Sequence, residues 1–117
     1  MSKVFIITPW RDEPEKSRED YFRIRRELEL KGYDVAAGLD KPGARTIMMP
    51  FSGEVRNRDL YRLGLMLQHM STCDKVVMPD RAKLCQDATI EQVAAMAFGL
   101  DVYNEDMDAI TRANGQE

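Results

Sequence analysis

The chain has 117 residues, of which 44% are hydrophobic and 32% charged, and its formal net charge is −3. This length suits one domain with a core of its own, and the composition excludes a disordered chain. The apolar runs are too short to cross a bilayer. Charges of both signs are mixed, with seven basic and seven acidic residues in Arg11–Lys31. The sequence therefore lacks the dominant basic face that non-specific nucleic-acid binding needs.

Signals for export, metals and cofactors are weak. The stretch MSKVFIITPW has one Lys and no small-residue cleavage site, so we expect a first strand, not a signal peptide, and a cytoplasmic protein with no membrane segment. Cys73 and Cys85 are then expected to be reduced thiols. One His and two separated Cys do not make a zinc site. Neither G-x-G-x-x-G nor G-x-x-x-x-G-K-[ST] occurs, so we expect no cofactor and no metal.

The first part of the chain predicts a strand, a helix and a second strand. Lys3–Thr8 is apolar and β-branched, which is typical of a strand buried on both faces. Glu15–Lys31 predicts a helix, with Pro14 at its start and Gly32 just past its end. Tyr33–Ala37 then predicts a strand parallel to the first, because βαβ units connect parallel strands.

The middle of the chain predicts a long loop and a second helix. Gly38–Val55 is rich in Gly and Pro and is expected to cover a pocket or to pack on a partner subunit. Arg56–Met70 predicts a helix whose core stripe is Leu60, Leu63, Leu67 and Met70. Leu65 and Met66 lie beside this stripe, so Leu65 is either an ordinary exposed residue or part of a homo-oligomer interface. His69 is expected on the solvated side.

Lys75–Pro79 predicts the third strand and Asp80–Gln86 a polar loop. Asp87 suits the N-cap of a helix over Ala88–Phe98, which Gly99 ends.

Leu100–Tyr103 predicts the fourth strand. Asn104 is expected to cap a short acidic helix holding Met107 and Ile110, within a single domain over residues 1–112. Residues 113–117 are expected to fray.

Alternating strands and helices indicate an α/β domain, with a parallel sheet of about four or five strands and helices on both faces. Ligands of such sheets bind beyond the carboxyl ends of the strands, at the switch point of strand order. The segments expected there are Thr8–Asp12, Gly38–Lys41, Pro79–Asp87 and Asn104.

Glu91 is the main candidate for chemistry, because it is a carboxylate at the edge of an otherwise apolar helix face beside Ala94, Ala95 and Phe98. A carboxylate that reaches the crevice could attack an anomeric carbon and form a covalent sugar ester. The alternative is that an acid in a first helical turn simply stabilises the helix dipole.

The segment LYRLGLMLQHMSTCDKVVMPDRAKLCQDATIEQVAAMAFGLDVY resembles the C-terminal half of the nucleoside 2-deoxyribosyltransferase superfamily, whose pattern is [AC]-D-x-[VI], a loop, and G-[TA]-x-x-E-x-G-x-A. The matching residues are Cys73, Asp74, Val76, Val77, Ala88, Glu91, Ala94 or Ala95, Ala97 and Gly99. VFIITPW and YFRIRRELELKGYDV resemble the N-terminal half more loosely. The likeness is greatest to a branch of small phage and bacterial domains of unknown function.

The resemblance implies a single flavodoxin-like or Rossmann-like domain, a homo-oligomer, and cleavage or transfer of the N-glycosidic bond of a deoxynucleoside or its monophosphate. Glu91 would be the nucleophile, with Asp87 or Asp80 near the base. The family's loop after the first strand maps to Thr8, Pro9, Trp10 and Arg11, which would bind the substrate. Trp10 either stacks on a base or anchors the loop in the core.

This sequence has Thr8-Pro9 where the family has a G-P turn, and it departs from the family at three further places. The family's Asp six residues before the nucleophile is Cys85 here, and the Gly four residues before it is Asp87. Leu65 and Met66 stand where an Asp is expected in the preceding helix. The alternative reading is therefore an inactive nucleotide-binding or protein-interaction module of the same fold. Phosphate contacts could come from the basic residues Arg11, Arg45, Arg56, Arg58, Arg81 and Lys83.

Overall fold

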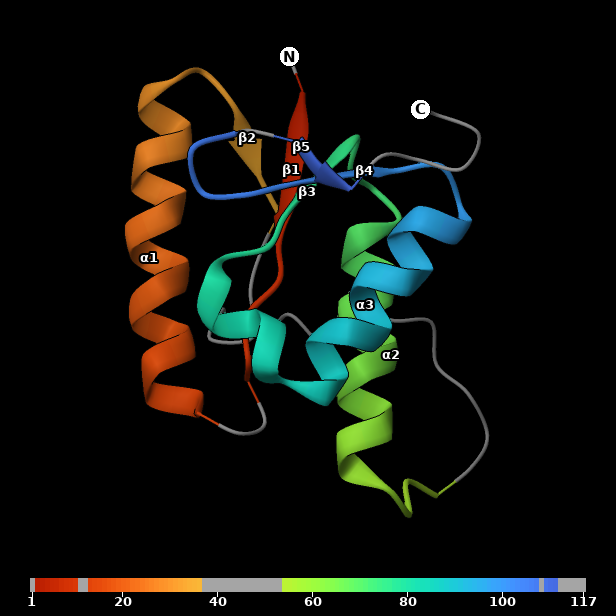
Figure 1. The fold of residues 1–117 in the computed structure, drawn as a ribbon. Helices are drawn as coiled ribbons and strands as arrows, with labels where there is room; N and C mark the ends of the chain where they lie inside the picture. The colour runs from red at the N-terminus through yellow and green to blue at the C-terminus, as the bar shows by residue number, and fades with distance from the viewer. Residues whose placement is uncertain (1, 11–12, 37–53, 108, 112–117) are drawn as a thin grey trace.

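The structure is a computed structural model that describes residues 2–10, 13–36, 54–107 and 109–111 (Figure 1). The strands are β1 (Lys3–Ile6), β2 (Asp34–Val35), β3 (Lys75–Val77), β4 (Asp101–Tyr103) and β5 (Ala109–Thr111). The helices are α1 (Pro14–Leu30), α2 (Arg58–Met70), the 3₁₀ helix η2 (Asp80–Leu84) and α3 (Gln86–Ala97).

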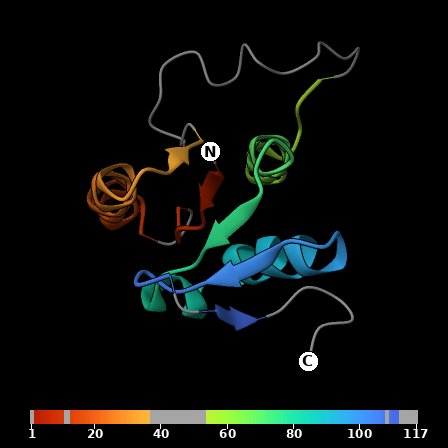
Figure 2. The ribbon, with the colours of Figure 1, turned by 90° about the horizontal axis from the view of Figure 1, so that it is seen from above.

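The five strands form one sheet in the order β2-β1-β3-β4-β5. The first four strands are parallel, and β5 pairs antiparallel with β4. The view from above shows α1 on one side of the sheet and α2 with α3 on the other (Figure 2). This confirms the predicted α/β fold with helices on both faces. The parallel strand order is that of flavodoxin-like domains, whose switch point lies between β1 and β3.

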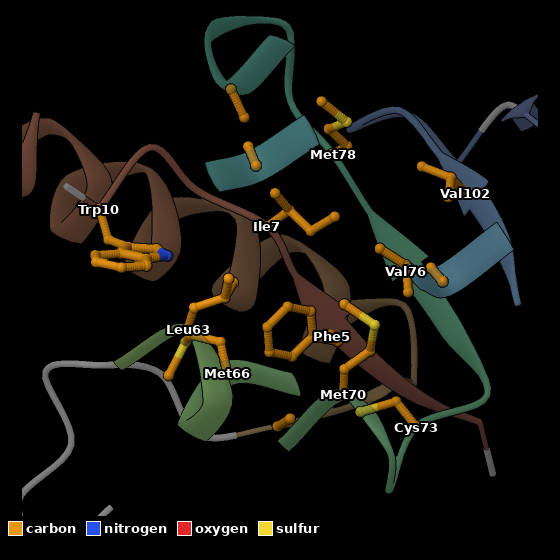
Figure 3. Packing of buried hydrophobic residues seen from close by; sticks show 14 of the residues in the cluster. Phe5, Ile7, Trp10, Leu63, Met66, Met70, Cys73, Val76, Met78 and Val102 are labelled. Carbon is orange, nitrogen blue, oxygen red and sulfur yellow. The ribbon is translucent and has the colours of Figure 1, made fainter. Parts of the chain in front are cut away.

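Alternation along β1 builds a core on each side of the sheet, because successive side chains of a strand point to opposite faces. Val4 and Ile6 pack in the cluster under α1, together with Ile24 and Leu28. Phe5 and Ile7 belong to the cluster under α2 and α3. In that cluster Trp10 lies near Leu63, and Phe5 lies near Met70 at the other end (Figure 3). The apolar runs of the sequence are thus buried on both faces, as predicted.

Several predicted helix ends are confirmed. Pro14 occupies the first turn of α1. Of Asn57 and Ser52, the two caps that the sequence suggests for α2, Asn57 is the cap, since its side chain accepts a hydrogen bond from the backbone N–H of Leu60 at 2.9 Å. Gly32 and Gly99 follow their helices with φ of +96° and +87°, which glycine adopts without steric cost. Among the described residues, no helix has both the length and the apolar character that a membrane span requires.

The predicted core stripe of α2 is confirmed at Leu63 and Met70, which are buried, but the predictions for Leu60, Leu65 and His69 are wrong. Leu60 is 62% exposed, whereas Leu65 and His69 are buried. The reason is that α2 contacts α3 as well as β1, so its buried arc is wider than a single sheet face requires. Leu65 is therefore neither an ordinary exposed residue nor available to a partner subunit. Burial, with the nearby Lys3, lowers the pKa of His69.

Two further local predictions are wrong. The expected polar loop over residues 80–86 contains η2, with Ala82 buried. The expected acidic helix after Asn104 is a turn leading to β5, because the side chain of Asn104 accepts from the backbone N–H of Asp106 at 2.9 Å. Such side-chain bonds favour a turn over a helix. The expected frayed residues 113–117 and most of the expected loop over 38–55 lie outside the described residues.

The two glycines Gly32 and Gly64 should respond to alanine with opposite sign. An added Cβ has nothing within 4 Å at either position, so only the backbone matters. Gly32→Ala should lower the free energy of unfolding by about 1 kcal/mol, because φ is +96° there. Gly64→Ala, inside α2, should raise it by up to about 1 kcal/mol. Urea unfolding measures both, and a destabilised Gly64→Ala would contradict this account.

Candidate functional site

The segment after β1 turns sharply at the switch point. The backbone N–H of Trp10 donates to the carbonyl of Thr8 at 2.9 Å, and that of Glu13 donates to the carbonyl of Pro9 at 2.9 Å. Thr8, Pro9 and Trp10 are all buried. This turn directs the indole of Trp10 into the layer that contains α2 and α3, where it joins the apolar cluster (Figure 3). Trp10 is therefore a core residue, the second of its two predicted roles.

Helix α3 follows β3 and η2, and it places two carboxylates on one buried face. The helix begins at Gln86 with Cys85 as its N-cap, so Asp87 is not the cap that the sequence predicts. Asp87 lies in the first turn, and Glu91 lies one turn further on, not in the first turn as predicted. Residues four apart share a helix face. Both side chains are buried, and Glu91 has no exposed surface at all.

The side chain of Glu91 is held by one hydrogen bond. The indole Nε1–H of Trp10 donates to Glu91 Oε2 at 2.9 Å. Glu91 Oε1 is buried and has no hydrogen-bond partner within the described part of the chain. Ala88 and Ala95, which precede and follow Glu91 on α3, are buried and apolar. The carboxyl group therefore lies among apolar side chains.

These surroundings raise the pKa of Glu91 from its ordinary 4.5 to about 7. Desolvation is the largest cause, and the charge of Asp87 adds to it, while the hydrogen bond from Trp10 acts in the opposite direction. A carboxyl with a pKa near neutrality exists as both acid and carboxylate at pH 7. Groups of this kind concentrate at functional sites.

The helix-dipole explanation of Glu91 can be compared with the cost of burying its charge. A favourable helix dipole contributes about 0.3–1 kcal/mol, and only near the first turn. A pKa raised from 4.5 to about 7 corresponds to a cost of about 3 kcal/mol for the ionised form. The dipole explanation suits Asp87 but does not account for the buried position of Glu91.

The other predicted site residues are more scattered. Asp80 starts η2 at the surface, where Lys83 Nζ lies 3.2 Å from its Oδ1, and its side chain is 88% exposed. Arg11 lies outside the described residues. Thr8 and Pro9 supply backbone carbonyls that shape the turn before Glu13. The structure thus brings together Trp10, Glu91 and Asp87 from the predicted set.

Two of the three further departures from the superfamily pattern lie in the apolar core, whereas the third, Asp87, is a buried carboxylate outside the apolar cluster. Cys85, Leu65 and Met66 belong to the same apolar cluster as Trp10. Cys85 is a buried free thiol, and burial of this kind does not activate a cysteine. No carboxylate therefore stands at the positions where the superfamily has its partners for the nucleophile.

One residue at the site is missed by sequence reasoning. The guanidinium carbon of Arg62, on α2, lies 5.8 Å from the centre of the Trp10 ring. Arg62 itself is exposed. The contact joins residues 52 positions apart, and no local pattern in the sequence signals it.

Comparison with known protein families, with curated proteins and with solved structures gives no match. The resemblance to deoxyribosyltransferases therefore depends on the residues quoted above, and the activity that it implies is a proposal.

The raised pKa of Glu91 predicts how stability changes with pH in Glu91→Gln. Between pH 4.5 and about 7 the folded protein holds a proton that the unfolded chain has released. The stability of the wild type relative to the variant should therefore fall as pH rises through this window, by about 3 kcal/mol in all. In Glu91→Gln the amide carbonyl oxygen can still accept the hydrogen bond from Trp10. The cost of burying the amide group does not change with pH, so it cancels when the stability differences at two pH values are compared.

Urea unfolding of both proteins at pH 4.5 and pH 8.5 measures this change. Glu27→Gln, at an exposed position of α1, is the matched control and should show no comparable dependence. A stability difference that is the same at both pH values would show that Glu91 titrates normally.

Proposed function

We propose that this protein is a nucleoside 2-deoxyribosyltransferase-like enzyme, acting on the N-glycosidic bond of a deoxynucleoside or its monophosphate with Glu91 as the nucleophile. The observation that supports this most is the state of the Glu91 carboxyl group. It is buried at the switch point with one oxygen held by Trp10 at 2.9 Å, while its other oxygen has no partner among the described residues. The resemblance to the superfamily supports the same residue.

The first step follows from this geometry. Trp10 fixes Oε2 of Glu91, and so Oε1 is the oxygen that attacks the anomeric carbon. A bond forms between Oε1 and the sugar, the N-glycosidic bond breaks, and its electron pair leaves with the base. The base takes up a proton as it leaves. The product is a covalent sugar ester of Glu91.

The second step releases the sugar. Water, or the nitrogen of a second base, attacks the same anomeric carbon and expels the carboxylate of Glu91, giving hydrolysis or transfer. Asp87 lies one turn away on the same face of α3 and is the proposed group beside the base. Its charge also keeps the pKa of Glu91 high, so part of the enzyme holds a protonated Glu91 at pH 7.

A substrate must uncover Glu91, which has no exposed surface. Trp10 is the side chain bonded to it, so binding should displace the indole or its neighbours. By the same resemblance we propose that the protein is a homo-oligomer, and we keep the separate expectation that it is cytoplasmic.

Activity should depend on Glu91 and on pH. Purified protein with a panel of deoxynucleosides and their monophosphates should release free base, measured by chromatography. The ratio kcat/KM should rise about tenfold per pH unit below pH 7 and level off above it, because only ionised Glu91 attacks. Glu91→Ala and Glu91→Gln should each lose about 10³-fold or more.

Glu27→Gln serves again as the control and should keep full activity. Base release that persists unchanged in Glu91→Ala would remove Glu91 from the reaction.

One observation favours a second candidate, a nucleotide-binding module without turnover. Cys85 occupies the position of the superfamily's base-holding Asp and is buried in the apolar cluster. If this loss abolishes catalysis, nucleotides should raise the melting temperature without any release of base, since a ligand that binds only the folded state stabilises it. Thermal-shift measurements with the same panel separate the two candidates. Absence of stabilisation by every nucleotide would exclude the binding module.

A further inference from the structure

We propose that Arg62 recognises a negatively charged group on the ligand, so that the site prefers a deoxynucleoside 5′-monophosphate to the corresponding deoxynucleoside. The identity of the rest of the ligand rests on the proposed function. Arg62 is a specificity residue in this proposal, because it binds the ligand away from the reacting bond.

Arg62 lies beside the ring of Trp10. Its guanidinium carbon lies 5.8 Å from the centre of the Trp10 ring, and Trp10 in turn donates to Glu91. Trp10 is 2% exposed, whereas Arg62 is exposed. The guanidinium therefore forms the outer layer over the buried indole and carboxyl group. A ligand that approaches Glu91 from this side meets Arg62 first.

No acidic side chain among the described residues forms a salt bridge with Arg62. Within the described part of the chain Arg62 takes part in no salt bridge and no hydrogen bond, and its contact with the Trp10 ring is the interaction that the structure records for it. Other arginines differ, since Arg23 bonds Glu105 and Asp20 and Arg25 bonds Glu29. A guanidinium on a ring at an exposed site is held weakly.

A phosphate group is a stronger partner for Arg62 than the Trp10 ring. A phosphate offers oxygens that fit the planar guanidinium fork in two parallel, charge-assisted hydrogen bonds, which are stronger than a solvent-exposed ring contact. We therefore expect the Arg62 guanidinium to leave the Trp10 ring and to bind a phosphate group. Arg62 lies in the second turn of α2.

Arg62 and Glu91 both contact Trp10, the guanidinium over its ring and the carboxyl group at its N–H. In a nucleoside 5′-monophosphate the phosphate and the anomeric carbon are at opposite ends of the sugar. Such a ligand can set its anomeric carbon at Glu91 and its phosphate at Arg62, which keeps the two negative groups apart.

Binding measurements in the Glu91→Gln background test this without turnover. Trp10 is the only tryptophan of the chain, so its fluorescence reports on the site directly. Deoxynucleosides, their 5′-monophosphates and inorganic phosphate are titrated in turn. The monophosphates should bind about tenfold or more tightly than the nucleosides. R62A should bring the two affinities within about twofold, and R62K should give an intermediate preference.

The matched control is R26A, which removes the same charge from an exposed position on α1, across the sheet, and should keep the full preference. Equal affinities for nucleoside and monophosphate, or a preference that survives R62A, would overturn the role of Arg62. Inorganic phosphate binding as tightly as the nucleotide would overturn the ligand class. The reaction is tested separately with Glu91 intact: if no base is released but the Arg62-dependent preference persists, the catalytic proposal fails and the recognition stands.

Discussion

The hydrogen bond from Trp10 Nε1 to Glu91 Oε2 is the interaction on which the candidate site depends. It joins the segment after β1 to the helix after β3, across 81 positions of sequence. Strands β1 and β3 are parallel neighbours in the sheet. The hydrogen bond therefore joins the two segments that leave these strands at the switch point. A buried carboxyl group needs a donor, and a buried indole N–H needs an acceptor. Each of the two residues thus satisfies the requirement of the other.

The same bond explains why Trp10 is a core residue and still belongs to the site. Its ring packs with Leu63 and Ile7 in the cluster between the sheet and α2 (Figure 3). Its one polar atom is directed to Glu91. The apolar part of the side chain fixes the ring, and the fixed ring holds the carboxyl oxygen. Stacking on a free base would require the indole to leave this position.

Local patterns in the sequence predict most of the fold. A continuous apolar and β-branched run places β1, and Pro14 and Gly32 mark the ends of α1 because their effects on the backbone are local. The rotation of α2 is not predictable in this way, since α3 widens its buried arc and brings in Leu65 and His69. Predicting the orientation of a helix from its hydrophobic periodicity assumes that only one face of the helix is covered. The turn at Asn104 is a similar case, because its side chain serves a helix cap and a turn equally well.

Sequence also indicates Glu91 but not its surroundings. A lone carboxylate on an apolar helix is visible in the sequence, whereas its bond to Trp10 and the guanidinium of Arg62 above that ring arise only when three distant segments meet. The beginning of α3 at Gln86 decides which acid the helix dipole stabilises. That boundary lies two residues before the predicted one, and this small difference moves Glu91 out of the first turn.

The raised pKa of Glu91 has its main physical origin in burial. Cys85, Leu65 and Met66 put apolar side chains where the superfamily has carboxylates, and all three lie in the cluster that contains Trp10. Apolar surroundings disfavour the charged form of a carboxyl group, and desolvation is the largest cause of the pKa near 7. A second acid at Cys85 would add like charge and raise that pKa further. Within the described residues, the hydrogen bond from Trp10 is the recorded contact that stabilises the ionised form of Glu91 in these apolar surroundings.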